Sequence, residues 1–278
     1  MSRPLHRTII HGRRAALIFG LALAAAHAQA DQDTLYVTAQ ADSMSTAGDG
    51  GGAAVEWQRT LSDRAGINLG ALSYSLAGSR WTYGKVIGHL KAHEKATLYG
   101  EIDGGAGRRE GEGFTYQVYK AGMITTLVAG RLFLDLEDQY LHVDVTKENL
   151  VKGGVVVVPV PSLTAAVSYY VSTAGTADSR FLSGRLDTHG RRTGSFAGFT
   201  VGRSSPERFN IITSTDEAQH SNELYVGTSI PAGSNMITLV LDRLRIADET
   251  KHTFSVTWKL PLHAARPPGP AQPPGRVH

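Results

Sequence analysis

The stretch DTLYVTAQAD, residues 33–42, alternates between apolar and polar side chains from Leu35 onward. Successive side chains of a β-strand point to opposite faces of the sheet, so Leu35, Val37, Ala39 and Ala41 share one face. The residues between them are polar and share the other face. The stretch therefore predicts a strand with one apolar and one polar surface.

The residues before this strand have the three-part layout of a secretory signal peptide. Basic residues Arg3, Arg7, Arg13 and Arg14 precede an apolar run over 15–26, and the A-x-A pattern at 28–30 marks a cleavage site. An uncleaved membrane anchor is the alternative, but the apolar run is only about half of the ~20 residues that span a bilayer as a helix. We expect residues 1–30 to be removed and the mature chain, beginning at Asp31, to be exported.

Composition limits the partners and the covalent chemistry of the exported chain. Four of the 28 Lys and Arg residues, and none of the 25 Asp and Glu residues, lie in the first 30 positions, so the remainder is close to neutral. There are no blocks of like charge, and we therefore expect no nucleic-acid partner. The chain has no cysteine, so a disulfide framework and a thiolate metal site are both excluded.

Period-two alternation continues along the rest of the chain. It is clear in KATLYGEIDGG, RLFLDLED, LTAAVSYYVS and HTFSVTWKLPL, and segments rich in Gly, Pro, Asn and Asp separate such runs. Turns of this kind make successive strands antiparallel neighbours. Two segments depart from the pattern: LVKGGVVVVPV is apolar on both faces, and the apolar face changes within DRLRIAD, where we expect a β-bulge.

Three features favour a membrane barrel over a soluble sandwich. Charges of both signs lie in mid-strand, aromatic residues lie near the strand ends, and the last strand carries aromatic and apolar residues at every second position. We predict an all-β fold, an antiparallel up-and-down transmembrane β-barrel of about 14 strands, with 12 and 16 as alternatives. The barrel is expected over 31–262, followed by a disordered Pro/Gly-rich tail over 263–278.

The segments AGRLFLDLEDQYLHVDV, AAVSYYVS, FAGFTVGRSSPERF and HTFSVTWKLPL resemble Gram-negative outer-membrane β-barrels and, more weakly, the YaiO-type group. The resemblance covers about a quarter of the mature chain and implies insertion into the cell outer membrane from the periplasm. Lipopolysaccharide, outer-membrane lipid and the barrel-assembly machinery are then the expected partners. One departure is that such barrels end on an aromatic residue, whereas 16 residues follow Leu262 here.

The polar faces of the predicted strands supply the candidate functional residues. We expect the lumen to be lined by Glu101, Asp103, Arg131, Asp135, His142 and Asp144. A charged lumen favours a narrow channel for polar solutes, such as glycans or small ions. The alternative is a structural or envelope-assembly barrel whose lumen is plugged by ion pairs.

An outer-membrane hydrolase that modifies lipid is a further alternative. His142 and Asp144 are two apart on a strand and share a face, as the base and carboxylate of a nucleophilic serine would. No serine is marked as their partner, and neither G-x-S-x-G nor H-E-x-x-H occurs in the chain. We therefore assign no catalytic residue, expect no enzyme activity, and expect no cofactor or metal.

Overall fold

The computed structural model describes residues 33–45, 48–76, 78–109, 111–143, 146–175, 178–190, 193–204 and 219–262. The predicted signal peptide and the predicted tail over 263–278 lie outside the described residues. Every regular element within the described ranges is a β-strand. Over the same ranges, no helix has the length and apolar character needed to cross a membrane.

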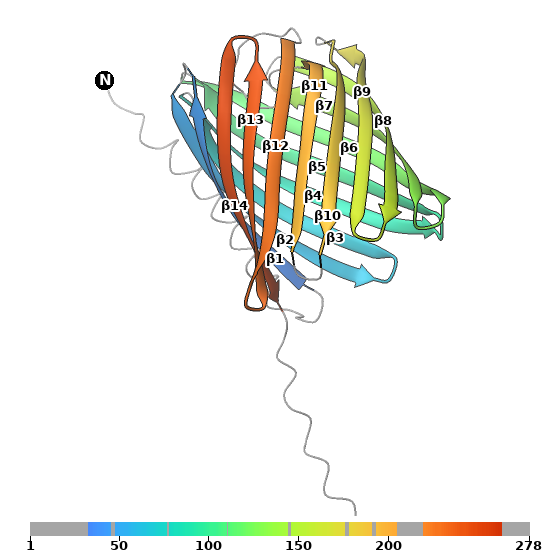
Figure 1. The fold of residues 1–278 in the computed structure, drawn as a ribbon. Helices are drawn as coiled ribbons and strands as arrows, with labels where there is room; N and C mark the ends of the chain where they lie inside the picture. The colour runs from blue at the N-terminus through green and yellow to red at the C-terminus, as the bar shows by residue number, and fades with distance from the viewer. Residues whose placement is uncertain are drawn as a thin grey trace, which may run out of the picture.

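The strands form one closed antiparallel barrel (Figure 1). They are β1 (Asp33–Met44), β2 (Asp49–Ser62), β3 (Ala65–Leu76), β4 (Ser79–His93), β5 (Ala96–Arg109), β6 (Glu112–Val128), β7 (Leu132–Val143), β8 (Thr146–Val160), β9 (Leu163–Gly175), β10 (Arg180–His189), β11 (Gly194–Ser204), β12 (Gln219–Ala232), β13 (Asn235–Ile246) and β14 (Glu249–Leu262). Each strand pairs with its neighbours in sequence. The predicted fourteen-stranded up-and-down barrel is confirmed.

Closure joins the first strand to the last. β1 pairs with β14 along its whole length, from Asp33 opposite Leu262 to Met44 opposite Lys251. A closed barrel leaves no unpaired edge whose backbone groups would need other partners. Because the strand number is even, Asp33 and Leu262 lie at the same end. We call this the terminal end of the barrel and the opposite end the distal end.

The strands reverse at the terminal end through tight hairpins and irregular pairing. Gly130, in the turn between β6 and β7, and Gly233, between β12 and β13, have φ of 67° and 66°, a conformation that glycine adopts without steric cost. The pairing register shifts near the terminal ends of β2, β4, β6 and β8. Such β-bulges are common at barrel rims, where they end or redirect the pairing.

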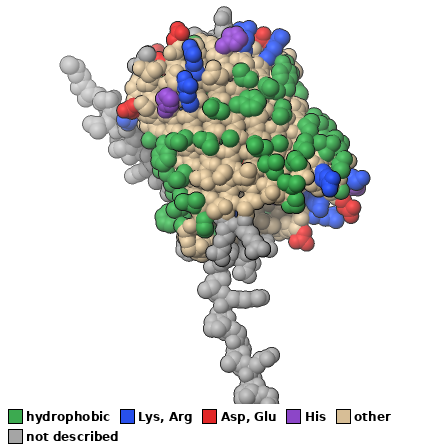
Figure 2. Space-filling view, in the orientation of Figure 1, with side chains coloured by type: hydrophobic (Ala, Val, Ile, Leu, Met, Phe, Trp, Pro, Cys, Tyr) green, Lys and Arg blue, Asp and Glu red, His purple; other side chains and the backbone are tan. Residues whose placement is uncertain are grey.

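The outer surface of the barrel is a broad apolar belt. Side chains on alternate positions of the strands point outward, and many of them are apolar and exposed. They include Val37, Val86, Leu98, Ile102, Leu136, Val155, Val167, Tyr169, Leu182, Phe199, Leu224, Val226, Leu241, Phe254 and Trp258. Figure 2 shows hydrophobic side chains across the middle of the visible face and charged side chains gathered towards its ends.

The face change that the sequence indicated at DRLRIAD has another cause. β13 pairs with β14 in an unbroken register from Met236 to Ile246, so the expected bulge is absent and that prediction is wrong. Leu244 and Ile246 are instead buried at 2% and 4% exposure. They alternate with outward-facing Arg243 and Arg245, so they point into the barrel. The strand keeps its register, and it is the interior of the barrel that becomes apolar towards the distal end.

Candidate functional site

The interior surface of the barrel is the candidate functional site. On β4, the interior face carries Trp81, Tyr83 and Lys85. Residues between and after them, such as Thr82 and Val86, point outward. Across the barrel wall, interior positions are brought into register by strand pairing, for example Lys85 opposite Asp103. Charged side chains that are far apart in sequence therefore become neighbours inside the barrel.

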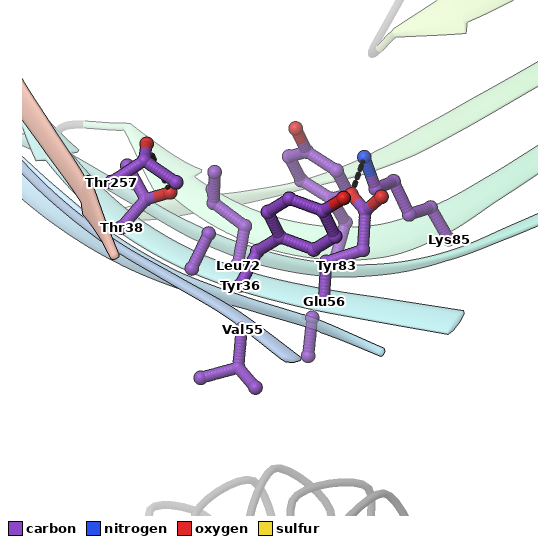
Figure 3. A pocket seen from close by; sticks show the side chains of 10 residues that line it. Tyr36, Thr38, Val55, Glu56, Leu72, Tyr83, Lys85 and Thr257 are labelled. Atoms are coloured by element: carbon purple, nitrogen blue, oxygen red, sulfur yellow. Dashed lines mark hydrogen bonds and ion pairs between the residues drawn. The ribbon is translucent and has the colours of Figure 1, made fainter. Parts of the chain in front are cut away.

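Glycines in the wall allow long interior side chains to lie flat and reach across a strand. Lys85 on β4 passes over Gly70 on β3 and forms an ion pair with Glu56 on β2. A Cβ atom on Gly70 would lie 2.8 Å from Cε of Lys85, which is too close for a real contact. Figure 3 shows Glu56 and Lys85 pointing towards one another, while Val55 points away from the interior.

Lys152 is the centre of the largest interior ion-pair network on the described strands. Its Nζ lies 2.9 Å from Oδ2 of Asp135 and 3.3 Å from Oε2 of Glu137. The Tyr99 hydroxyl lies 2.9 Å from an oxygen of each of these carboxylates. Lys152 also donates to the Tyr99 hydroxyl at 3.1 Å. One ammonium therefore offsets part of the charge of two carboxylates, and the Tyr99 hydroxyl hydrogen-bonds to them; the network joins β5, β7 and β8, with the Tyr99 ring crossing β6.

Apolar side chains fill part of the interior near the distal end. They come from the distal parts of β1, β3, β4, β6 and β7. The buried cluster consists of Met44, Tyr74, Leu76, Trp81, Phe114, Val118, Leu141 and Val143. Tyr74 and Trp81 have ring centroids 4.5 Å apart in a tilted arrangement. This distal cluster occupies one side of the lumen and narrows the space left beside it.

Two adjoining cavities lie in the remaining interior space. The first, of about 240 Å³, is lined by Tyr36, Glu56 and Lys85 among others. The second, of about 380 Å³, lies further towards the distal end. Both include Leu72 and Tyr83 in their linings, so they meet at these two side chains.

The second cavity has aromatic and acidic walls. On one side are Trp81 and Tyr74 of the distal cluster, and on the other are Tyr225 on β12 and Asp242 on β13. Glu223 and Lys251 also line it. Aromatic faces attract cations, and carboxylates accept hydrogen bonds from solute donors. These walls therefore suit a solute that carries N–H or O–H groups.

The two aspartates near this cavity differ in their partners. Asp42 accepts from the Tyr74 hydroxyl at 2.5 Å and from the Thr253 hydroxyl at 2.5 Å, and Lys251 lies 3.6 Å away. Asp242, in contrast, has a buried Oδ1 without a hydrogen-bond partner among the described residues. Asp42 is part of the wall structure, while Asp242 keeps an acceptor available.

The structure places three of the predicted lumen residues together on the interior face. Glu101 forms an ion pair with Lys120 at 2.6 Å. Asp103 is 6% exposed and lies two residues further along the same face of β5. Asp135 on β7 belongs to the Lys152 network. Glu101 and Asp103 therefore lie on one strand, and Asp135 lies two strands away.

Two other predicted residues, Arg131 and His142, do not join them. Arg131 is an exposed residue of the turn between β6 and β7, because β7 begins only at Leu132. His142 lies on the opposite face of β7 from Asp135, since Leu141 and Val143, at 2% and 0% exposure, take the interior positions there. Asp144 lies outside the described residues. The expectation that apolar side chains always face outward caused the wrong placement of His142.

Sequence reasoning missed the basic partners and the aromatic lining of the interior. Lys85, Lys120 and Lys152 sit among small or apolar neighbours, and nothing in their local sequence shows which carboxylate each will meet. Tyr99 shares a face with Glu101 and Asp103 in the alternation, which is a signal that could have placed it inside. Which carboxylate each lysine meets is decided by the pairing of the strands.

Among comparisons with known proteins, only the one with solved structures finds a likeness. No family model and no curated protein matches the chain. Among solved structures, the chain is similar to the CymD monoaromatic hydrocarbon channel, with a TM-score of 0.64, 10% identity, and coverage of 90% of this chain and 93% of that one. It is also similar to the P. putida toluene transporter TodX, with a TM-score of 0.54, 10% identity, and coverage of 90% and 92%. At this identity the likeness is one of fold, that of outer-membrane β-barrel channels.

Proposed function

We propose that the protein is an outer-membrane channel for small polar solutes and that it favours cations over anions. The observation that carries the proposal is the pair of adjoining cavities inside a closed barrel whose outer surface is apolar. An apolar outer belt with a polar interior is the arrangement that a membrane-spanning barrel requires. The fold likeness to outer-membrane channels supports the same placement.

The preference for cations follows from the second cavity. Glu223 and Asp242 line it, and the one basic side chain in its described lining, Lys251, already lies near Asp42. A wall of low dielectric around acidic groups raises the local concentration of cations and lowers that of anions. Small solutes with hydroxyl groups remain compatible with the same acceptors.

A monoaromatic solute is the second candidate. Tyr74, Trp81, Tyr83 and Tyr225 all line the second cavity, and Leu72 and Val240 add apolar surface. The two similar structures are named as a hydrocarbon channel and a toluene transporter, which supports this candidate at the level of fold. The resemblance to the YaiO-type group remains a prediction from sequence.

Single-channel recording of the purified protein in a planar bilayer tests the proposal. In a KCl gradient we expect discrete steps and a reversal potential of the sign that K⁺ selectivity gives. The double variant Asp242→Asn and Glu223→Gln should move that potential towards zero. The matched control Asp138→Asn removes an exposed, outward-facing carboxylate of β7 and should leave it unchanged.

Aromatic probes of equal size then separate the two candidate solutes. Tyramine is a cation, and tyrosol is its neutral alcohol. Block of the K⁺ current by tyramine alone favours the polar cation channel, whereas equal block by both favours a monoaromatic solute. A silent bilayer would favour a plugged structural barrel and contradict the channel. Hydrolysis of lipid that is lost in His142→Ala would instead support the hydrolase alternative.

A further inference from the structure

Outward-facing basic side chains gather at the distal rim of five adjacent strands, β10 to β14. We call this set the distal basic patch. It consists of Arg180, Arg203, His220, Arg243, Arg245 and His252, all of which are exposed. In Figure 2, Lys, Arg and His side chains lie at the upper end of the visible face, with some Asp and Glu side chains among them and hydrophobic side chains below.

The patch lies directly at the border of the apolar belt. Arg203 follows the exposed Val201 by two positions on β11, and Arg243 follows the exposed Leu241 by two positions on β13. Residues two apart on a strand point to the same face. The basic side chains therefore point outward from the wall, at the height where the belt ends, and do not point into the lumen.

Strand pairing places basic residues opposite one another within the patch. Arg180 lies opposite Arg203, and Arg203 lies opposite His220. Between β13 and β14, Arg243 lies opposite His252. Residues directly opposite each other on paired strands have Cβ atoms about 4.5–5.5 Å apart, so one anionic group can contact both side chains.

One acidic side chain, Asp178, borders the patch. Arg180 forms an ion pair with Asp178 at 3.2 Å, and both side chains are more than half exposed. A similar outward-facing arrangement recurs on β4 and β5, where Arg80 lies opposite Arg108. A group of outward-facing basic side chains at the edge of an apolar belt is suited to an anion supplied by the membrane itself.

We propose that the distal basic patch binds the phosphate groups of lipid A, the anionic anchor of lipopolysaccharide in the outer leaflet. The orientation rests on the proposed function, because the termini of bacterial outer-membrane barrels lie in the periplasm and the distal end then faces outward. Guanidinium groups bind phosphate through two parallel hydrogen bonds. Lipid A phosphates lie at the border between hydrocarbon and water, as the patch does.

Native mass spectrometry of the detergent-purified protein tests this site, with bisphosphorylated lipid A and dephosphorylated lipid A as probes. We expect clear preference for the phosphorylated form. The double variant Arg243→Gln and Arg245→Gln should weaken its binding about tenfold or more. The matched control Arg64→Gln and Lys95→Gln removes two exposed charges from turns at the terminal end and should bind lipid A as the unchanged protein does.

A second measurement guards against a variant that simply unfolds. In detergent without lipid A, replacement of these two exposed side chains should leave the temperature of unfolding unchanged, as judged by heat-modifiable migration on a gel. A lower unfolding temperature, equal weakening in both double variants, or equal binding of the two lipids would each overturn the site. If lipid A binding fails these tests but the protein still gives channel steps in a planar bilayer, the proposed function stands and the lipid A site is wrong. If the protein binds lipid A but gives no channel steps, the lipid A site stands and the proposed channel function is wrong.

Discussion

The ring of Tyr99 on β5 covers Gly122 on β6, and this contact lets the phenol reach the carboxylates of β7. Tyr99 and Gly122 are cross-strand partners in the register. A side chain at position 122 would occupy the space of the ring itself. The interior network of Lys152 therefore depends on the absence of one side chain on the strand that it crosses.

Substitution of Gly122 by alanine should displace the Tyr99 ring and weaken the network. We expect a loss of about 1–3 kcal/mol in the free energy of unfolding, as is typical when atoms are forced into a filled space. A urea titration of folding into lipid vesicles measures it. Gly153→Ala on β8 is the control, because a Cβ there meets nothing within 4 Å. Equal effects of the two variants would show that the Tyr99 contact does not matter.

The two faces of β9 should respond differently to a charge. Val167 is 50% exposed on the outer belt, whereas Ser168, the next residue, points into the barrel. Val167→Arg should cost about 2–4 kcal/mol because the guanidinium would meet hydrocarbon. Ser168→Arg should be much milder in the same vesicle-folding titration. Similar costs at both positions would contradict the assigned faces or the membrane placement.

Loss of the Lys152 ammonium should be more damaging than loss of one of its carboxylates. Lys152→Met leaves Asp135 and Glu137 without their cation inside the barrel, where its own exposure is only 8%. We expect a destabilisation of roughly 3 kcal/mol, the usual result of an uncompensated buried charge. Adding Glu137→Gln to Lys152→Met should recover part of it. If the double variant is no more stable than Lys152→Met in chemical unfolding, the two carboxylates do not repel one another.

Truncation of the distal cluster should widen the passage. Trp81→Ala removes an indole that forms part of the cluster and also lines the second cavity. Single-channel conductance should rise, while the free energy of unfolding falls by about 3–5 kcal/mol. Phe199→Ala, on the outer belt at 40% exposure, is the control and should leave conductance unchanged. Conductance that does not change with Trp81→Ala would place the constriction elsewhere.

The alternation of side chains was enough to predict the all-β class, the antiparallel barrel and its fourteen strands. The reason is local: each strand must satisfy an apolar exterior and a polar interior, so its own sequence records both faces. The outward-facing series Leu98 and Ile102, or Val167 and Tyr169, can be predicted in this way without any knowledge of the neighbouring strands. Glu101 and Asp103 could be placed together on one face for the same reason.

The interior of the barrel was decided by tertiary structure. Leu141 and Leu244 look lipid-facing in sequence, yet they point inward, because the distal cluster supplies an apolar environment built from strands distant in the chain. Lys152 meets Asp135 and Glu137, and Arg180 faces Arg203, only through the register that pairing and closure impose. A strand's sequence therefore fixes which side chains share a face, whereas the partners across that face exist only once the barrel has closed.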